Sequence, residues 1–323
     1  MSINQANEIK SGGIAMTAAL IIASGKTDGK EFLKPDKKIG TITAIERIVL
    51  SFQHSGIQRI VIVSSGADDF VKKLVPSMNL TFLECADGPE MFDRIKTGLA
   101  YLEDKCTRAL ITYVDIPMFS ADTVRALLDA HADLCIPSYR DRCGHPVLLQ
   151  AAHFARVRSY TGGQGLKGAT KALGLSIQIV EVADAGILSD IQKDTEYEKL
   201  LPDHDLAKLH ASFRFRIYKE RTFYGPGPHH LLCLTRETGS LSEACRYMGI
   251  SYSKGRKIIA AIESQMGVRV IETQQGGRGG GFSHLTREAK ELMRCYDAFC
   301  TDAKQVFQEL FEKHFSHPMK PDA

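Results

Sequence analysis

The chain has 323 residues, 44% of them hydrophobic and 24% charged, as is ordinary for soluble globular proteins, and this length suits two domains with separate cores. Residues 1–200 contain 23 Lys+Arg against 24 Asp+Glu (net −1), whereas residues 211–290 contain 13 against 6 (net +7), which indicates a polyanionic partner for the later segment. The eight cysteines include no C-x-x-C pair, which argues against a zinc ribbon or redox dithiol, and no apolar stretch reaches the roughly 20 residues of a membrane span.

The polar start MSINQANEIKSGG lacks the apolar region of a signal peptide, so a cytoplasmic protein without a membrane partner is expected. Short apolar runs then alternate with amphipathic stretches. In TAIERIVLSFQ the apolar residues recur at helical spacing, whereas RIVIV and ALITYV are short, continuous and β-branched, as buried strands are. Strands are therefore expected in residues 20–23, 58–65, 108–114 and 133–139, and helices in residues 43–53, 70–75 and 121–132.

This alternation predicts an α/β domain at residues 17–201, with a Rossmann-like, mostly parallel sheet and helices on both faces. Ligands bind such sheets beyond the carboxyl ends of the strands. Gly25, Ser65 and Asp115 follow or end three of the expected strands, so the sequence predicts a ligand site at this edge.

The first of these turns contains Gly25-Lys26-Thr27, which raises the question of a Walker phosphate loop. Leu20 occupies the place of that motif's first glycine, so the interpretation as an ATPase is weak. A glycine-bearing turn remains, which either brings backbone N–H groups close to a phosphate or is purely structural.

Residues 202–211 are predicted to be a linker, and a second domain is expected at residues 212–323. It opens with a basic strand or arm, FRFRIYKER, followed by a Gly-Pro-Gly-Pro break. Three helical patterns follow, each closed by a glycine, with Ser240 and Ser251 as candidate N-caps. A strand, a glycine-rich tip bearing Arg278, a returning strand and a long amphipathic helix complete this segment.

The first 200 residues resemble the MobA-like nucleotidyltransferases, which join a nucleotide to molybdopterin. Lys34 lies nine residues after Gly25 and Glu46 twelve residues further on, which is the spacing of that family's opening motif. The family's Arg-Met-Gly is absent, because Gly29-Lys30-Glu31 stands in its place. The resemblance implies a fold like that of the nucleotide-diphospho-sugar transferases and a nucleoside triphosphate substrate.

Two acidic motifs extend the resemblance. YVDIPMFSADTVRALLDA places Asp115 where the family holds its magnesium ion, and SDIQKDTEYEKL places Asp190 as the second carboxylate. Carboxylate oxygens are the hard ligands that Mg²⁺ prefers, and a lysine neutralises charge on departing pyrophosphate. The resemblance therefore implies Lys34, Asp115 and Asp190 as catalytic residues and Mg²⁺ as the cofactor held by Asp115 and Asp190. It implies these nucleotide-binding residues: Ala23, Ser24, Gly25, Lys34, Ser65 and Asp87.

The string Gly-His-Pro-Val at residues 144–147, followed by Thr-Gly-Gly-Gln-Gly, is similar to the cytidylyltransferase branch, so we favour CTP over GTP. His145 either contacts the pterin or its phosphate or is a structural histidine at the start of a strand. Gly163, Gly165 and Lys167 either hold a phosphate-bearing substrate or form an ordinary loop.

The C-terminal segment resembles the winged helix of the molybdate-responsive ModE-type repressors, which are related to LysR-type DNA-binding domains. The resemblance rests on TGSLSEACRYMGISYSKGRKII and the glycine tip GGRGGG. It implies a homodimer on double-stranded DNA, with a recognition helix in the major groove and a wing on phosphate or the minor groove. The implied DNA-binding residues are Ser251, Tyr252, Ser253, Lys254, Arg256 and Arg278.

Two hypotheses for the whole chain remain open. The first is a Mg²⁺-dependent enzyme that transfers CMP, or alternatively GMP, to molybdopterin and carries a fused winged helix. The second is a molybdenum-related transcriptional regulator whose transferase-like domain is a non-catalytic sensor. A winged helix that only dimerises or docks a protein is an alternative to DNA binding under either hypothesis.

Overall fold

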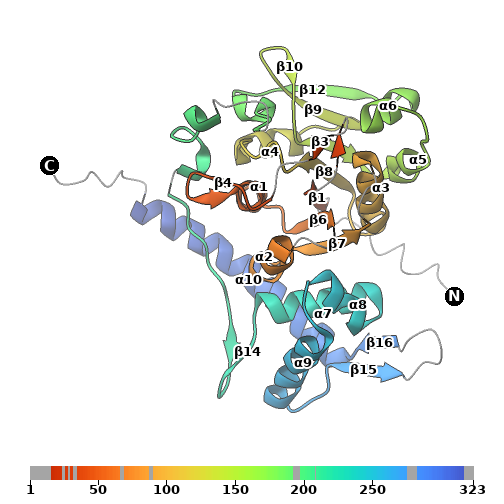
Figure 1. The fold of residues 1–323 in the computed structure, drawn as a ribbon. Helices are drawn as coiled ribbons and strands as arrows, with labels where there is room; N and C mark the ends of the chain where they lie inside the picture. Colours follow the sequence, from red (N-terminus) through yellow and green to blue (C-terminus); the bar gives the residue numbers. More distant parts are fainter. Residues whose placement is uncertain are drawn as a thin grey trace. The chain divides into compact units, whose positions relative to one another are not determined.

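The computed structural model describes residues 16–23, 26–27, 30–31, 35–65, 69–86, 90–191, 197–207, 209–274 and 282–315. The chain divides into two compact units. The first comprises Met1–Val71 and Leu80–Ala207, and the second comprises Lys72–Asn79 and Lys208–Ala323 (Figure 1). Within the described ranges, no helix has both the length and the apolar character needed to span a membrane.

The first unit is built on a mixed sheet with a parallel centre. Strand β1 (Thr17–Ile22) lies between β6 (Arg59–Ser65) and β8 (Arg108–Tyr113), and β7 (Thr81–Cys85) extends the sheet beyond β6. All of these neighbours run parallel. Five of the six residues of β1 are buried, as expected for a central strand covered on both faces.

The sheet continues beyond β8 with an antiparallel strand, β11 (Val147–Gln150), which pairs with β8 and with β9 (Leu134–Tyr139). Strand β9 also pairs with β10 (Arg142–Cys143) and, in parallel, with β12 (Ile177–Glu181). The predicted α/β fold with a mostly parallel sheet is therefore confirmed, and β7 and β12 are additions that the sequence patterns did not indicate. Short two-residue strands form two further pairs: β2 (Lys26–Thr27) with β3 (Lys30–Glu31), and β4 (Lys38–Ile39) with β5 (Ile42–Thr43).

Helices lie on both sides of this sheet (Figure 1). On one side α1 (Ala44–His54) packs against α4 (Ala121–Leu128), with the rings of Phe52 and Phe119 5.1 Å apart. On the other side α3 (Met91–Leu102) packs with α5 (Phe154–Arg158) and α6 (Gly165–Ala172). Helix α2 (Asp69–Met78) follows β6 in the chain.

Helix α1 begins where the sequence predicts a helix, at a capping box. Thr43 accepts a hydrogen bond from the Glu46 amide, and the Glu46 carboxylate accepts one from the Thr43 amide. Glu46, whose spacing contributes to the family resemblance, therefore serves in this structure to start α1.

The start of α4 is held by side chains from a distant part of the chain. Ser120 caps the helix by accepting from the Thr123 amide. Asp184 accepts from the Ser120 amide at 2.8 Å, and Asp205 accepts from the Ala121 amide at 2.7 Å. The segment that follows β12, with the 3₁₀ turns η3 (Ala185–Leu188), η4 (Tyr197–Leu200) and η5 (Asp205–Ala207), is thus fixed to the start of α4.

The second unit contains a helix-turn-helix followed by a two-stranded ribbon. Helix α7 (Pro226–Thr238) precedes α8 (Leu241–Tyr247) and α9 (Tyr252–Met266); β15 (Ile271–Gln274) pairs antiparallel with β16 (Phe282–Leu285), and α10 (Arg287–Phe315) follows. A small hairpin, β13 (Ile217–Tyr218) with β14 (Thr222–Tyr224), opens the unit. This order of elements is compatible with a winged helix.

The helix ends agree with the sequence signals. Ser240 and Ser251 cap α8 and α9, and Gly239 and Gly267 end α7 and α9 in the left-handed conformation that glycine favours. Helix α7 begins earlier than predicted, at Pro226, because proline is tolerated in the first turn of a helix.

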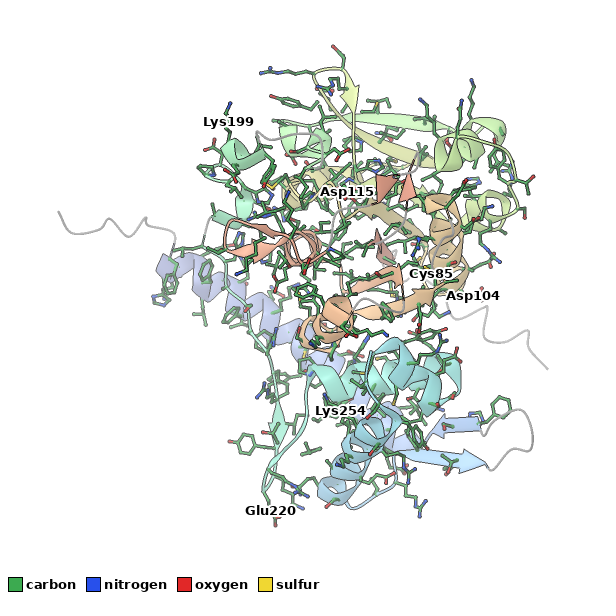
Figure 2. All side chains as sticks on the ribbon, in the orientation of Figure 1. Cys85, Asp104, Asp115, Lys199, Glu220 and Lys254 are labelled. Carbon is green, nitrogen blue, oxygen red and sulfur yellow. The ribbon has the colours of Figure 1, made fainter. Side chains whose placement is uncertain are left out.

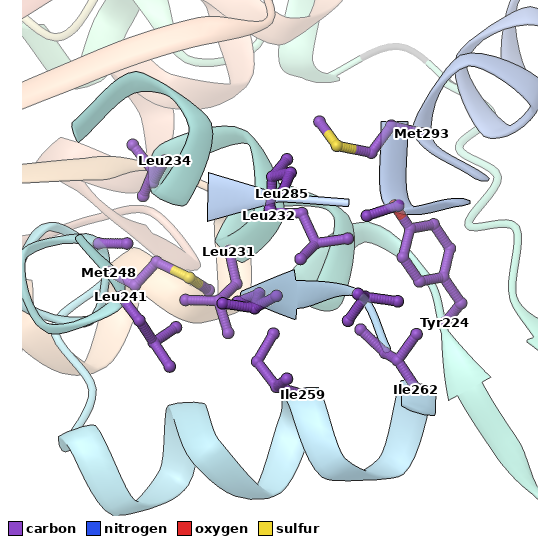
Figure 3. Packing of buried hydrophobic residues seen from close by; sticks show 14 of the residues in the cluster. Tyr224, Leu231, Leu232, Leu234, Leu241, Met248, Ile259, Ile262, Leu285 and Met293 are labelled. Atoms are coloured by element: carbon purple, nitrogen blue, oxygen red, sulfur yellow. The ribbon is translucent and has the colours of Figure 1, made fainter. Parts of the chain in front are cut away.

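One core joins the elements of the second unit. Side chains from β14, α7, α8, α9, the ribbon and α10 form a continuous buried cluster (Figure 3). Helices α8 and α9 cross closely because residue 255 is glycine: a Cβ there would lie 2.2 Å from the Cys245 sulfur.

We predict that Asp205 stabilises the first unit in a pH-dependent way. Burial raises its pKa, but the hydrogen bonds from His204 and from the Ala121 amide outweigh this effect and lower the pKa to about 2. Because the folded pKa lies below the unfolded value of ~3.9, about 2 kcal/mol of stability should be complete above about pH 4 and lost as the pH falls towards 2. Asp205→Asn should remove this contribution, as measured by urea unfolding at several pH values.

The matched control is Asp122→Asn, at an α4 carboxylate whose side chain is 74% exposed and paired with Arg125. This variant should remain within about 0.5 kcal/mol of wild type. A difference between Asp205→Asn and wild type that is the same at pH 7 and pH 2.5 would contradict the assignment.

Candidate active site

The carboxyl ends of β1 and β8 bring two predicted site residues together. The Ala23 amide donates to the Val63 carbonyl of β6, and the Val114 amide donates to the Ile22 carbonyl at 3.0 Å. Val114 is thus bonded to Ile22 across the two strands. The next residue on each strand, Asp115 and Ala23, therefore lies at the same edge of the sheet, where the resemblance places the nucleotide. Asp115 is buried, with 8% of its surface exposed, and lies inside the first unit in Figure 2.

The second predicted carboxylate is brought to the same place by one backbone contact. The Ile191 amide donates to the Asp115 carbonyl at 2.9 Å, so Asp190, the preceding residue, is adjacent to Asp115 in space. Asp190 is half-buried. The two residues are 75 positions apart in sequence, yet the structure places both at the carboxyl edge of the sheet.

A second contact joins His145 to the same segment. Its amide donates to the Ile187 carbonyl at 3.0 Å, while the Gly144 amide donates to the Pro137 carbonyl. Residues 185–191 thus lie between the loop that carries Asp115 and the start of β11. Asp115, His145 and Asp190 are positioned by this one segment.

Two glycines permit these close approaches. A Cβ at residue 186 would lie 1.8 Å from the Met118 carbonyl oxygen, and a Cβ at residue 144 would lie 2.3 Å from the Ile187 carbonyl oxygen. Real side chains do not come this close to a carbonyl. Gly144 and Gly186 are therefore structural requirements of the site, although neither was predicted as a site residue.

The donor set at this edge suits a hard divalent cation. Asp115 and Asp190 offer only carboxylate oxygens, the ligands that Mg²⁺ and Mn²⁺ prefer. In the described ranges, no group of three or more His, Cys, Asp or Glu side chains is arranged to hold a metal. Two carboxylates leave most coordination positions open, which is typical of a cation bound together with substrate phosphates.

A large cavity lies next to Gly144 and His145, although neither Asp115 nor Asp190 belongs to its lining. Its volume is about 1220 Å³, and its lining includes the aromatic rings of Phe92 and Tyr113 and the aliphatic side chains of Ile136, Leu175 and Ile177. Gly144 and His145 belong to the same lining. The cavity therefore opens next to the segment that positions Asp115 and Asp190.

His145 is a neutral base in this cavity. Its ring packs edge-on against Tyr113, with the centroids 4.7 Å apart. Burial lowers the pKa of His145 to about 4, although a hydrogen bond with the Ile111 backbone raises it in part. Its Nδ1 is buried and has no hydrogen-bond partner among the described residues. Burial likewise raises the pKa of Tyr113 to about 12, so both rings are uncharged at neutral pH.

The predicted glycine loop leads into α6 and lines the cavity. Gly163 accepts a hydrogen bond from the Tyr160 hydroxyl, and Gly165 begins α6 with a positive φ of 55°. Gly165 and Lys167 contribute to the cavity lining, whereas Gly163 does not. Lys171, one turn after Lys167, also contributes, and the four-residue spacing on a helix is the signal that could have revealed it.

Several predicted residues lie outside the described part of the chain: Ser24, Gly25, Lys34, Asp87 and Arg278. Ser65 ends β6, but its side chain is not described. The predicted roles of these residues remain predictions.

The predicted DNA-binding residues gather at the first turn of α9. Tyr252, Ser253, Lys254 and Arg256 are exposed, as is Ser251 before them. The Ser251 hydroxyl accepts from the Lys254 amide and so also caps the helix. Lys257, which the sequence analysis did not assign, is exposed beside Arg256 and adds a third cation to this surface.

Residues 19–177 match the family model of the MobA-like NTP transferase domain. The transcriptional regulator ModE of Yersinia pestis is 33% identical over 92 residues, which are 28% of this chain and 35% of that protein. The chain therefore matches about a third of the length of that curated relative.

Two solved structures are similar to part of this chain. Rv0371c of Mycobacterium tuberculosis H37Rv, in complex with manganese, has a TM-score of 0.48 and 16% identity over 58% of this chain and 98% of that one. A 4-diphosphocytidyl-2C-methyl-D-erythritol synthase has a TM-score of 0.48 and 18% identity over 58% of this chain and all of that one (100%).

We predict that Gly186→Ala displaces the segment that carries Asp190. The new methyl group would overlap the Met118 carbonyl, and overpacking of this kind costs about 1–3 kcal/mol. Gly163→Ala is the matched control, because a Cβ at residue 163 meets no atom within 4 Å. It should change stability by less than about 0.5 kcal/mol in the same denaturation experiment. Equal stability of the two variants would show that the close approach is not a constraint.

Proposed function

We propose that residues 17–201 form a Mg²⁺-dependent nucleotidyltransferase that transfers CMP from CTP to the terminal phosphate of molybdopterin, with GTP as the alternative donor. The observation that carries this proposal is the backbone hydrogen bond from Ile191 to Asp115, which sets a second carboxylate beside the first at the edge of a MobA-like domain. Asp115 is buried and Asp190 is half-buried. A cation bound by both carboxylates would relieve the repulsion between their like charges.

The two substrates are assigned to opposite sides of the carboxylates. The nucleotide takes the side of Ala23 and the loop after β1, and the acceptor takes the cavity. Phe92, Ile136 and Leu175 form apolar walls that suit a flat heterocycle, and Lys167 and Lys171 line the same cavity with cations that suit its phosphate. His145 lines the same cavity and is uncharged at neutral pH, so it adds no charge beside the acceptor.

In the proposed reaction, an oxygen of the acceptor's terminal phosphate attacks the α-phosphorus of the nucleotide. A new phosphorus–oxygen bond forms, the bond to the bridging α–β oxygen breaks, and pyrophosphate leaves with that electron pair. Asp115 and Asp190 would hold Mg²⁺, which when bound would supply positive charge to the phosphate oxygens. Lys34 is assigned to the departing pyrophosphate, and the chain's contribution is to hold both phosphates in line and exclude water from the cavity.

Asp115→Asn should reduce turnover by roughly 100-fold, since removing a group that stabilises transition-state charge has an effect of this size. The measurement is pyrophosphate release with Mg²⁺, molybdopterin and each nucleoside triphosphate in turn, and CTP should give the highest rate. Asp122→Asn, at an exposed α4 carboxylate, is the control and should keep wild-type activity.

Three results would change the assignment. Unchanged turnover in Asp115→Asn would remove the metal role of that residue, and a preference for GTP would reverse the choice of nucleotide. Nucleotide or molybdopterin binding without any pyrophosphate release, together with a ligand effect on DNA affinity, would favour the alternative: a regulator with a non-catalytic sensor domain.

For residues 212–323 we propose a winged-helix dimer that binds double-stranded DNA. The supporting observation is the exposed first turn of α9, where Lys254, Arg256 and Lys257 follow a well-formed cap. The similarity to ModE of Yersinia pestis supports the same assignment. Helix α10 offers exposed apolar side chains at Phe299, Val306 and Leu310, which suit a second copy of the chain.

If Lys254 contacts a phosphate, Lys254→Ala should make the plot of log affinity against log salt shallower by about one unit. Each neutralised phosphate releases condensed counterion, so the slope counts such contacts. Lys304→Ala, at an exposed residue of α10, is the control and should keep the wild-type slope. Absence of sequence preference in a selection from random duplexes would instead favour a module that only dimerises.

A further inference from the structure

The second unit has a basic hairpin that none of the assigned roles uses. We define it as residues 216–222, which include β13, the turn and the start of β14. Its side chains include three exposed cations, Arg216, Lys219 and Arg221, against one carboxylate, Glu220. Tyr218 is 74% exposed, which is unusual for a tyrosine with a core beside it.

The hairpin is firmly anchored at its base. Ile217 pairs with Tyr224, whose side chain is completely buried in the core of the second unit. Just before the hairpin, the ring of Phe215 stacks on Phe299 and Tyr296, with centroids 4.1 and 5.8 Å apart. The base is therefore packed against α10 and the rest of the core of the second unit.

The tip of the hairpin is fixed to the recognition helix. The Glu220 amide donates to the Gln265 side-chain oxygen at 3.2 Å, and Gln265 lies in the last turn of α9. Lys254, in the first turn of the same helix, is eleven residues earlier, or ~16 Å along the axis. The major groove is ~12 Å wide, so a helix whose first turn enters the groove brings its far end to the phosphates that border it.

The charge of the second unit is concentrated on this side. Residues 212–274, which contain the hairpin and the helix-turn-helix, carry ten Lys+Arg and five Asp+Glu, net +5. Helix α10 carries five and six, net −1. A charge excess that served only general solubility would be spread over all elements. The positive excess is instead found in α9 and the elements next to it.

We propose that the basic hairpin is a second phosphate-binding element for duplex DNA, acting with the first turn of α9. Lys219 and Arg221 neutralise backbone phosphates, and the Tyr218 hydroxyl donates a hydrogen bond to a phosphate oxygen. Such contacts position the protein on the duplex and carry no sequence information. This inference rests on the DNA binding proposed for the second unit.

The test uses the full-length protein and two probes, a duplex selected from a random library and an unselected random duplex. The double variant Lys219→Ala/Arg221→Ala should make the salt plot shallower by about two units and weaken binding to both duplexes by the same factor. Lys219→Arg/Arg221→Lys should keep the wild-type slope, because it preserves both charges. Lys304→Ala is the control for loss of a distant charge.

The outcomes separate this inference from the proposed function. If wild type binds, Lys254→Ala lowers the slope and the hairpin variant keeps the wild-type slope, the hairpin assignment is wrong and DNA binding stands. A weakening confined to the selected duplex would also overturn it, because it would indicate base contacts. If wild type binds neither duplex, the proposed DNA binding and the hairpin assignment both fail. Unchanged thermal unfolding of the double variant shows that any loss reflects contacts, since all substituted side chains are exposed.

Discussion

The arrangement of the acidic residues in the first unit depends on direct backbone contacts among three segments of the chain, with no side chains between them. Residues 185–191 hydrogen-bond to Asp115 on one side and to His145 on the other, and Gly186 and Gly144 leave room for this. Neither strand pairing nor helix packing would by itself bring Asp190 to Asp115. Since an extra methyl group at either glycine would collide with a backbone oxygen, which cannot rotate away as a side chain can, the position of the acidic pair is set with little tolerance.

The carboxylates of the first unit lie in two different surroundings. Asp184 and Asp205 accept hydrogen bonds from the amides that begin α4, so their charge is balanced by the positive end of that helix. Asp115 and Asp190 lie at the carboxyl edge of the sheet, and the cavity that Gly144 and His145 line has the exposed lysines of α6 as its cations. Because the start of α4 already holds two carboxylates, it is not available to bind a phosphate. The phosphates of a substrate at this site would therefore depend on lysines and a metal ion for neutralisation.

The sequence predicts most of the fold because its strongest patterns are local. Buried β-branched runs indicate β1, β6 and β8, and Ser240 and Ser251 are caps whose chemistry is complete within four residues. By contrast, β12 has mostly exposed residues and does not read as a buried strand, and Gly186 and Asp184 act on residues more than 60 positions away. No local pattern distinguishes them from ordinary turn residues. Asp115 and Asp190 were predicted as site residues only through the resemblance to a family motif, because their proximity depends on long-range packing.

The crossing of α8 and α9 has a chemical consequence for the second unit. Cys245 fills the space beside Gly255, and burial raises the pKa of its thiol, which keeps it in the unreactive protonated form. Cys143 and Cys295, by contrast, are exposed. An alkylating reagent will therefore modify those two thiols first and reach Cys245 only when the two helices separate. Once Cys245 is modified, the two helices cannot pack together again, because the space beside Gly255 has no volume for an added group. The rate at which Cys245 is alkylated thus reports how often the helix pair opens.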